Sequence, residues 1–274
     1  MGLRRELYSL KTKDEVSKMK IIAVIPARMG SSRFPGKPLA PILGISMIEH
    51  VYRRTAMCSK LDEVYVATCD EEIMDAVAAF GGKAMMTSSK HERASDRVAE
   101  VMETLDGDLV VMVQGDEPMT YPQMIEDAIG PFFSGDDRII CVNLVARIPT
   151  EKEFENPNTI KVAMDKEHFA VYMSREPIPT RHKKSFGDIT AYKQVCIIPF
   201  TAEGLRKFKQ LPPTPLEEAE SIDMLRFIEH GYKVKLVETS FSTHAVDTPD
   251  DLRLVENLLI KDPLTKRYLN LIKR

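Results

Sequence analysis

The chain has 274 residues, of which 43% are hydrophobic and 29% are charged, and its formal net charge is −3. This composition excludes an intrinsically disordered chain and a general polyanion-binding surface, so we do not expect nucleic acid as a partner. The length fits a single α/β domain with an inserted subdomain. The four cysteines form no CxxC pair, which argues against a zinc site or disulfide framework and favours a reducing cytoplasm.

Residues 1–19 form an N-terminal extension that is too charged to be a signal peptide, and no run of 18 apolar residues predicts a membrane span. Leu3, Leu7 and Leu10 would share one side of a helix in this extension. A docked amphipathic helix and a disordered tail are therefore equal alternatives for this segment.

The first predicted strand is the apolar run IIAVI, which ends at Pro26. A run of this length between turn residues is typical of a buried strand in a parallel sheet. The next loop carries Arg28, Arg33 and Lys37 among small residues that leave backbone N–H groups accessible, namely Gly30, Ser31, Ser32 and Gly36. Such a loop suits a polyanion such as a nucleoside triphosphate.

Helical and β patterns then alternate up to residue 150. Helical spacing predicts helices over 46–58, 71–80, 94–105 and 121–133, and β-rich runs predict strands over 63–68, 83–86, 109–113 and 139–145. The alternation predicts a doubly wound, mostly parallel, Rossmann-like α/β core over residues 20–150. We expect its ligand site beyond the carboxyl ends of the strands.

The pattern changes over residues 151–200, where three β-rich segments are separated by turn residues, at 159–164, 169–173 and 191–198. We expect an inserted antiparallel subdomain here. Residues 201–274 return to the α/β core and its C-terminal helices. The expected helices are 202–210, 217–230 and 249–260, with a strand over 233–238.

Asp116 closely follows the predicted strand 109–113, so it should lie at the same sheet edge as Arg28 and Lys37. It could cap the next helix, but a carboxylate that holds Mg²⁺ against a triphosphate is attracted rather than repelled. We therefore predict Asp116 as a metal ligand. Asp247 precedes a helix opened by Thr248-Pro249 and is the candidate for a second ligand, with an ordinary helix N-cap as the alternative.

Six motifs follow one another between residues 20 and 260: PARMGSSRFPGKPL, VQGDEP at 113–118, NPNTIKVAMD at 156–165, YMSREPIP at 172–179, PLEEAES at 215–221 and AVDTPDDL at 245–252. As a set they resemble the 3-deoxy-manno-octulosonate (Kdo) cytidylyltransferases, the CMP-Kdo synthetases. The ARMGSSR portion alone also resembles the spore-coat polysaccharide nucleotidyltransferases, which lack the QGDEP and SREPIP motifs together.

The resemblance implies transfer of a cytidylyl group from CTP to an acidic sugar, with release of pyrophosphate, by a nucleotidyltransferase whose inserted subdomain forms a homodimer. It makes Arg28 and Lys37 the cations that neutralise the β- and γ-phosphates. Asp116 and Asp247 would hold the Mg²⁺ that assists in-line attack on the α-phosphate. The implied nucleotide contacts are Pro26, Ala27, Arg28, Ser31, Ser32, Lys37, Ser95, Arg97, Gln114 and Gly115.

The segment expected to read cytosine departs slightly from the family. The family usually carries His-x-Ser-Gly-Thr-Asp-Arg, whereas residues 91–97 are HERASDR, with Arg93 and Ala94 in place of serine and glycine. The alternative for Ser95, Asp96 and Arg97 is the solvated first turn of an N-capped helix.

The acceptor side departs further. The family's Arg-His-x-Gly-x-Tyr strand is here KQVCII at 193–198, so Gln194, Cys196 and Ile198 replace an imidazole, a glycine and a phenol. Because a polar mismatch costs roughly 1 to 3 kcal/mol, we expect altered specificity. The implied acceptor contacts are Arg33, Ser174, Arg175, Gln194, Glu217 and Glu218.

Glu218 replaces a glutamine of the family and adds a negative charge on the acceptor side. An 8-amino analogue of Kdo would supply a compensating cation. The alternatives are that Glu218 faces solvent and Kdo or another 2-keto-3-deoxy acid is used, or that the acceptor is a smaller anion such as a phosphonate. A competing hypothesis is a degenerate nucleotide-binding protein without turnover, against which the retained Arg28, Lys37, Asp116 and Asp247 argue.

Overall fold

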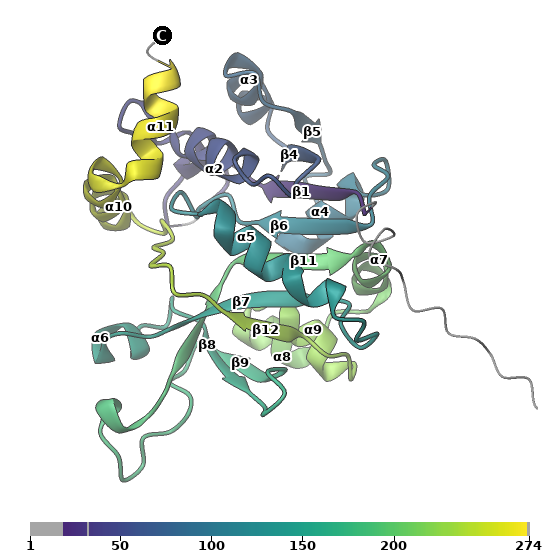
Figure 1. Cartoon of the computed structure of the whole chain (residues 1–274), viewed down its shortest axis with the longest axis vertical. Coiled ribbons are helices and arrows are strands. Elements are labelled where there is room, and N and C mark those ends of the chain that lie inside the picture. The colour runs from purple at the N-terminus through teal and green to yellow at the C-terminus, as the bar shows by residue number, and fades with distance from the viewer. Residues whose placement is uncertain (1–18, 32, 273–274) are drawn as a thin grey trace, which may run out of the picture.

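The computed structural model describes residues 19–31 and 33–272. The two alternatives for the N-terminal extension, a docked helix and a disordered tail, concern residues that lie outside the described range. The predicted nucleotide contact Ser32 also lies outside it. Two five-stranded sheets lie side by side, with helices packed around them and the C-terminal helices at one end (Figure 1). No helix among the described residues has the length and apolarity needed to cross a membrane.

The first sheet has the strand order β11-β6-β1-β4-β5. Four of its strands run parallel, and β11 is antiparallel to β6. The strands are β1 (Ile21–Pro26), β4 (Glu63–Thr68), β5 (Ala84–Met86), β6 (Leu109–Val113) and β11 (Ile197–Thr201). A short hairpin of β2 (Pro41–Ile42) and β3 (Ile45–Ser46) follows the first loop and its 3₁₀ turn η1 (Lys37–Leu39).

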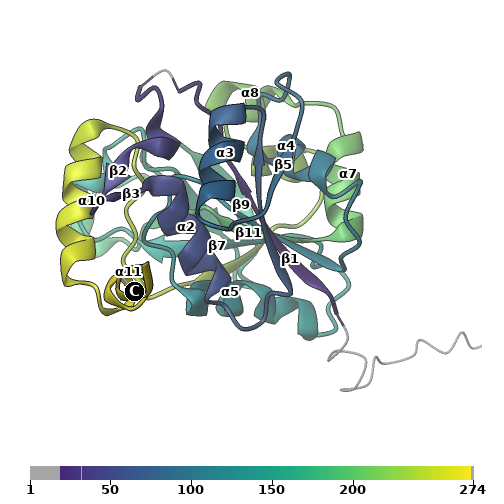
Figure 2. The ribbon, with the colours of Figure 1, turned by 90° about the horizontal axis from the view of Figure 1, so that it is seen from above.

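Helices cover both faces of this sheet, which explains why β1 is apolar throughout. Ile22 and Val24 of β1 pack with α4 (Ala94–Val101) and α7 (Ala202–Gln210), whereas Ile21 and Ile25 pack on the other side. The opposite layer contains α2 (Met47–Ala56), α3 (Glu71–Ala79) and α5 (Pro122–Ile129), which continues into η2 (Gly130–Phe133). Figure 2 shows β1 between α2 and α5 on one side and α4 and α7 on the other. This is the predicted doubly wound arrangement.

The second sheet has the order β12-β7-β10-β8-β9 and is antiparallel except for the β12–β7 pair. Its strands are β7 (Val142–Arg147), β8 (Lys161–Met164), β9 (Ala170–Ser174), β10 (Tyr192–Val195) and β12 (Lys235–Glu238). The helices α8 (Pro215–Glu220) and α9 (Met224–Glu229) pack near it, and α6 (Glu151–Phe154) and η3 (Phe186–Asp188) lie in its loops.

The helix expected over 94–105 ends at Val101, and two other predicted elements are each divided. The expected strand 191–198 is two strands, because the chain leaves the second sheet at Cys196 and β11 then pairs with β6 of the first. The expected helix 217–230 is also divided, since Ser221 adopts a left-handed backbone with φ 54° and ends α8. The strand pairings thus cross the bounds expected for the 151–200 insertion, because β7 and β12 join its sheet and β11 does not.

A buried ion pair fastens the C-terminal helices α10 (Pro249–Lys261) and α11 (Pro263–Ile272) to α2. Arg54 Nη1 lies 2.6 Å from Asp262 Oδ2, and both side chains are almost fully buried. Burial raises the pKa of Asp262, but hydrogen bonds from Tyr121, Arg54 and Thr265 outweigh it and hold this pKa at about 2. The Arg54 Nε also donates to the carbonyl oxygen of Thr120.

We expect Asp262→Asn to lower the free energy of unfolding by about 3–5 kcal/mol, because it leaves Arg54 buried without its counter-charge. Urea denaturation followed by circular dichroism measures the loss. The matched control is Glu49→Gln, which breaks the half-buried i,i+4 pair with Arg53 and should cost about 0.5 kcal/mol or less. A loss below about 1 kcal/mol for the Asp262 variant would contradict the anchoring role.

His50 is a second buried link between α2 and α11. Its Nε2 donates to the Ile42 carbonyl oxygen at 2.8 Å, and its Nδ1 accepts from the Tyr268 hydroxyl at 2.5 Å. These roles suit a neutral imidazole. Burial lowers the pKa of His50 to about 4 and outweighs the hydrogen bond to Ile42.

The unfolded chain therefore binds more protons than the folded chain between pH 6.5 and 4. As a result, the contribution of neutral His50 to the free energy of unfolding is complete above pH 6.5 and is lost as the pH falls toward 4. We expect the His50 contribution to fall by about 2 kcal/mol from pH 7 to pH 5. Urea denaturation at both pH values should show a smaller pH effect for His50→Gln than for the wild type. Equal pH effects in the two proteins would refute this assignment.

Candidate functional site

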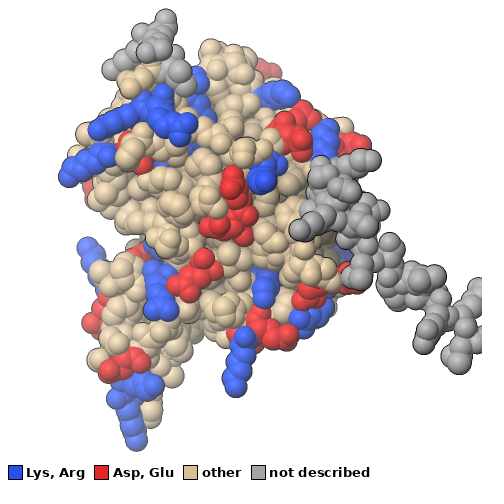
Figure 3. All heavy atoms as spheres, viewed as in Figure 1, with Lys and Arg blue, Asp and Glu red and all other residues tan. Residues whose placement is uncertain are grey.

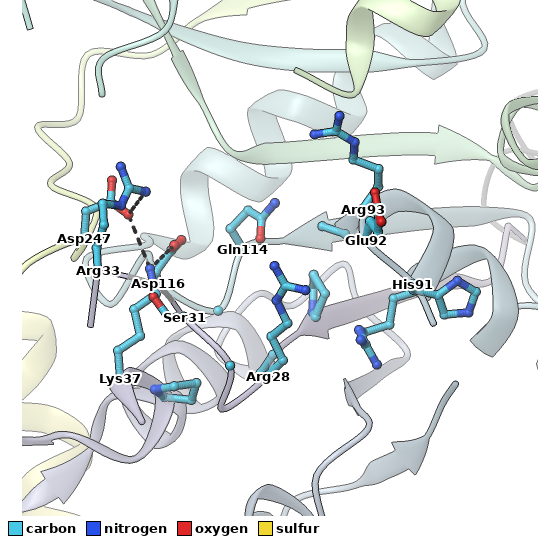
Figure 4. Close-up of a pocket in the computed structure, with 17 residues that line it drawn as sticks. Arg28, Ser31, Arg33, Lys37, His91, Glu92, Arg93, Gln114, Asp116 and Asp247 are labelled. Carbon is cyan, nitrogen blue, oxygen red and sulfur yellow. Dashed lines mark hydrogen bonds and ion pairs between the residues drawn. The ribbon is translucent and has the colours of Figure 1, made fainter. Parts of the chain in front are cut away.

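A cavity of about 290 Å³ opens beyond the carboxyl ends of β1 and β6 (Figure 4). This is where the parallel-sheet prediction expects a ligand. Most of the predicted nucleotide and metal residues line it, together with one predicted acceptor residue: Pro26, Ala27, Arg28, Ser31, Arg33, Lys37, Arg97, Gln114, Gly115, Asp116 and Asp247. The predicted residues that do not line it are Ser95, Ser174, Arg175, Gln194, Glu217 and Glu218.

The loop after β1 closes on itself before it reaches Lys37. Gly36 has φ 73°, a conformation that glycine adopts without strain, and its N–H donates to the Met29 carbonyl oxygen at 3.0 Å. The Met29 N–H is held by Asp70 Oδ2. Arg28 remains exposed on the cavity side of the loop. Among the described residues of the loop, Arg28 forms no ion pair, and both Arg28 and Lys37 line the cavity.

Lys37 bridges the two predicted metal ligands. Its Nζ lies 2.7 Å from Asp116 Oδ2 and 3.5 Å from Asp247 Oδ1, and it also donates to the Val246 carbonyl oxygen at 2.9 Å. Burial lowers the pKa of Lys37, but the Asp116 and Asp247 carboxylates outweigh it and raise this pKa above its usual value. The ammonium group therefore stays charged and occupies a position where two carboxylates hold a cation.

Backbone contacts bring these carboxylates together from distant parts of the chain. The Val246 N–H donates to the Asp116 carbonyl oxygen at 2.9 Å. Gly115 precedes Asp116 and passes so close to β1 that a Cβ atom there would lie 2.7 Å from the Pro26 carbonyl oxygen. Any larger residue at position 115 would push Asp116 away from the loop that carries Lys37.

Neither Asp116 nor Asp247 is the N-cap residue of the helix that follows it. Tyr121, and not Asp116, occupies the N-cap position of α5. Thr248 caps α10 by accepting from the Asp251 N–H, and the Asp251 carboxylate accepts from the backbone N–H groups of Asp247 and Thr248. The Asp247 side chain is therefore free to face the cavity.

Arg33 joins two parts of the chain, the first lobe around the first sheet and the second lobe around the second sheet. Its guanidinium donates to Asn158 Oδ1 at 2.5 Å, in a loop of the second lobe, and to Asp247 Oδ1 at 2.7 Å. Asn158 belongs to the NPNTIK motif, but sequence reasoning did not assign it a role. Arg33 was expected to bind the acceptor acid, and here it is paired with protein groups instead.

Glu117 is a second residue that sequence reasoning missed. It is 5% exposed, and its Oε2 has no hydrogen-bond partner within the described part of the chain. Burial, reinforced by the neighbouring Asp116 carboxylate, raises the pKa of Glu117 to about 8. Its place in the QGDEP motif was the available signal. Burial of this side chain distinguishes it from Asp116 and is not visible in the sequence.

The far end of the cavity is formed by the start of α4 and the loop before it, including His91, Glu92 and Arg93. Arg97 lines the cavity but is 3% exposed and donates to Thr87 and Cys69. Ser95 points away from the cavity, because its buried hydroxyl donates to Asp223 Oδ2 at 2.7 Å. Its predicted nucleotide contact stays a prediction that would need this hydrogen bond to break.

The predicted acceptor residues outside the cavity are bonded within the second lobe. Ser174 donates to the Glu220 carboxylate, and Arg175 donates to backbone carbonyl oxygens of residues 157, 220 and 221. Gln194 donates to Asn143 Oδ1. Glu217 is fully buried and accepts two hydrogen bonds of 2.7 Å from Arg226. Glu218 is exposed.

The described residues hold no group of three or more His, Cys, Asp or Glu side chains that could bind a metal ion by themselves. The pair Asp116 and Asp247 is nevertheless suited to Mg²⁺, which takes one or two carboxylates together with phosphate oxygens and waters. That both carboxylates already bind the Lys37 ammonium indicates that they gather around a cation.

Comparisons with known proteins show which family the chain is related to. A family model for cytidylyltransferases matches residues 22–237. A 3-deoxy-manno-octulosonate cytidylyltransferase of Geobacter metallireducens is 46% identical over 250 residues, which cover 88% of this chain and 98% of that protein. One of Geotalea uraniireducens is 46% identical over 252 residues, covering 89% and 100%.

The chain belongs to the 3-deoxy-manno-octulosonate cytidylyltransferase family. Among solved structures, a CMP:2-keto-3-deoxy-manno-octonic acid synthetase in complex with CTP matches with a TM-score of 0.81 at 38% identity, covering 88% of this chain and 99% of that one. Membership in the Kdo cytidylyltransferase family makes the protein a nucleotidyltransferase and confirms the predicted α/β fold class with its antiparallel sheet.

Proposed function

We infer that this protein transfers the cytidylyl group of CTP to Kdo and releases pyrophosphate. The observation that carries the inference is the cavity in which Arg28 and Lys37, from the loop after β1, meet Asp116 and Asp247 beyond the strand ends. The relatives that are 46% identical are named for this reaction, and the solved relative is described as a complex with CTP.

In this reaction a hydroxyl oxygen of the acceptor forms a bond to the α-phosphorus, and the bond to the bridging oxygen of the β-phosphate breaks. The hydroxyl proton passes to water and pyrophosphate leaves. Arg28 and Lys37 would neutralise the charge that develops on the leaving group, and the cavity walls would hold both reactants in line. Orientation of this kind can lower a barrier by roughly 7 to 11 kcal/mol, so no covalent nucleophile is needed.

We propose Asp116 and Asp247 as the residues that hold Mg²⁺. Bound there, Mg²⁺ would neutralise phosphate charge and polarise the α-phosphate. Lys37 now neutralises both carboxylates, so its ammonium group must exchange their oxygens for phosphate oxygens when nucleotide and metal enter. Arg33 would likewise leave Asp247 and become available to an anion.

Kdo is the acceptor that the site supports best. The preference for an 8-amino analogue depended on a carboxylate of Glu218 inside the acceptor site, and Glu218 is instead exposed on α8 and outside the cavity. The solvent-facing alternative for Glu218 therefore fits better. The hypothesis of a degenerate nucleotide-binding protein is disfavoured, because each predicted catalytic side chain lines one cavity.

We also propose a homodimer formed through the second sheet, in keeping with the family resemblance. β9 is the edge strand of that sheet, and its Val171 is 56% exposed.

A reducing cytoplasm remains our proposed location, since all four cysteines are free. On the face shown in Figure 3, basic side chains gather over α10 and α11, and basic and acidic side chains mix elsewhere.

We expect the purified protein to release pyrophosphate from CTP in the presence of Mg²⁺ and Kdo. The variant Asp116→Asn should have a kcat at least about 100-fold lower, because it loses a carboxylate charge that stabilises the transition state. A coupled pyrophosphate assay with Kdo, 8-amino Kdo, other 2-keto-3-deoxy acids and phosphonates measures this. Asp106→Asn, an exposed position at the opposite edge of the sheet, is the matched control and should remain active. If none of the acceptors in the panel led to release of pyrophosphate, the proposed function would be wrong.

The metal assignment predicts an effect that does not depend on turnover. Lys37→Met removes the ammonium group between Asp116 and Asp247, so we expect divalent cations to bind about tenfold more tightly in the absence of nucleotide. Mn²⁺ binding followed by electron paramagnetic resonance reports this affinity. The gain should disappear in the double variant Lys37→Met with Asp116→Asn. Unchanged Mn²⁺ affinity in Lys37→Met would count against the metal site.

A further inference from the structure

Asn158 supplies a contact between the second lobe and the loop after β1. Its Oδ1 accepts from Arg33 Nη1 at 2.5 Å, while Arg33 Nη2 donates to Asp247 Oδ1 at 2.7 Å. Arg33 and Asp247 both line the cavity, and their contact is visible in Figure 4. One nitrogen of the Arg33 guanidinium is thus held by a neutral amide of the second lobe, and another is held by a carboxylate of the site.

The loop that carries Asn158 is fixed by a buried cation. The Lys161 side chain is fully buried, and its Nζ donates to three backbone carbonyl oxygens, those of Asn156 at 2.8 Å, Thr159 at 2.9 Å and Arg175 at 2.5 Å. An ammonium group has three N–H donors, so each of them is used. Asn156 closes the loop from within, because its Oδ1 accepts from the Asn158 N–H at 2.9 Å and its carbonyl oxygen accepts from the Thr159 N–H at 3.0 Å.

Arg175 fixes the same loop from its other side. Its Nη1 donates to the Pro157 carbonyl oxygen at 3.1 Å and its Nε to the Glu220 carbonyl oxygen at 2.6 Å, while its backbone N–H donates to the Glu220 carboxylate at 2.8 Å. These bonds tie the loop to α8, although Asn158 itself is exposed. Because the backbone around Asn158 is fixed, little conformational entropy is lost when its amide holds Arg33.

The reaction brings anionic oxygens to this point of the site. In the ring form of a 2-keto-3-deoxy acid, the carboxylate is bonded to the carbon whose hydroxyl attacks the α-phosphorus, so it must lie close to Asp116 and Asp247. The triphosphate has oxygens there as well. With Asp247 committed to Mg²⁺, Arg33 Nη2 loses its partner and can bind one of these anions. The neutral Asn158 amide has no affinity for Mg²⁺ comparable to that of a carboxylate, so its bond to Arg33 Nη1 is retained.

We propose that Asn158 is a positioning residue for the reaction. Through Arg33 it fixes a guanidinium beside Asp247, where the guanidinium binds an anionic oxygen of the reactants, either the acceptor carboxylate or an oxygen of the triphosphate. The inference rests on the proposed function, which supplies both anions. Lys161 and Arg175 support this arrangement by holding the loop. Arg175, which was predicted to contact the acceptor, thus acts on the site through Asn158.

A double-mutant cycle tests whether Asn158 acts through Arg33. The wild type, Asn158→Ala, Arg33→Met and the double variant are compared in two assays. One measures the KM for Kdo at saturating CTP, and the other measures by calorimetry the affinity for a CTP analogue with an α,β-methylene bridge in the presence of Mg²⁺. A loss in the first assay identifies the carboxylate as the anion, and a loss in the second identifies the triphosphate.

In the assay that contains the anion, we expect Arg33→Met to weaken binding about 10- to 100-fold and Asn158→Ala about 3- to 10-fold. The double variant should lie within about twofold of Arg33→Met, because without the guanidinium Asn158 has nothing to position. Asn257→Ala is the matched control. This exposed asparagine donates to the Arg253 carbonyl oxygen on α10, and its loss should leave both assays unchanged.

Two outcomes would overturn the proposal. Losses that multiply in the double variant would show that Asn158 acts independently of Arg33, and unchanged values for Asn158→Ala in both assays would show that it positions nothing. If the wild type released no pyrophosphate with any acceptor, the proposed function would fail. The role of Asn158 would then still be decided without turnover, by the affinity for the analogue and by calorimetric binding of Kdo to the protein loaded with it.

Discussion

The structure depends most on the neutralisation of Asp116 and Asp247 by Lys37. Two carboxylates that face one cavity repel each other, and the repulsion grows as water is excluded. The Lys37 ammonium group removes this penalty by binding both, and the backbone bond from Val246 to Asp116 holds their segments together. The result is a preformed cation position beside a loop rich in cations. A position of this kind suits the Mg²⁺ and the triphosphate that we propose for it.

The packing of the C-terminal helices supports this arrangement from a distance. Asp247 lies just before α10, and α10 continues into α11, which is fixed to α2 through the buried Arg54–Asp262 pair and the contact between His50 and Tyr268. The loop with Lys37 and the hairpin that follows it lead directly into α2. The same helix therefore supports both sides of the carboxylate–lysine contact, so the stability of the core and the geometry of the site are linked.

The second sheet contributes none of the described residues that line the cavity, but it is joined to the first sheet close to it. The chain crosses from β10 to β11 at Cys196 and ties the two sheets together at the base of the site, where the Gln114 N–H donates to the Cys196 carbonyl oxygen. Side chains expected to meet the acceptor, such as Glu217 and Arg175, are instead used to hold this lobe together.

The sequence by itself determined the buried parallel strands, the cation-rich loop, and the family with its donor nucleotide, because apolar runs and contiguous motifs are local properties of the chain. It also indicated Asp116 and Asp247, each placed after a strand. Only the tertiary structure decided that Thr248 caps α10 and frees Asp247, that Glu117 is buried, that Glu218 is exposed, and that Arg33 and Arg175 are already bonded. Burial and pairing of these side chains depend on contacts between segments that are far apart in the sequence. The neighbouring residues in the sequence do not determine those contacts.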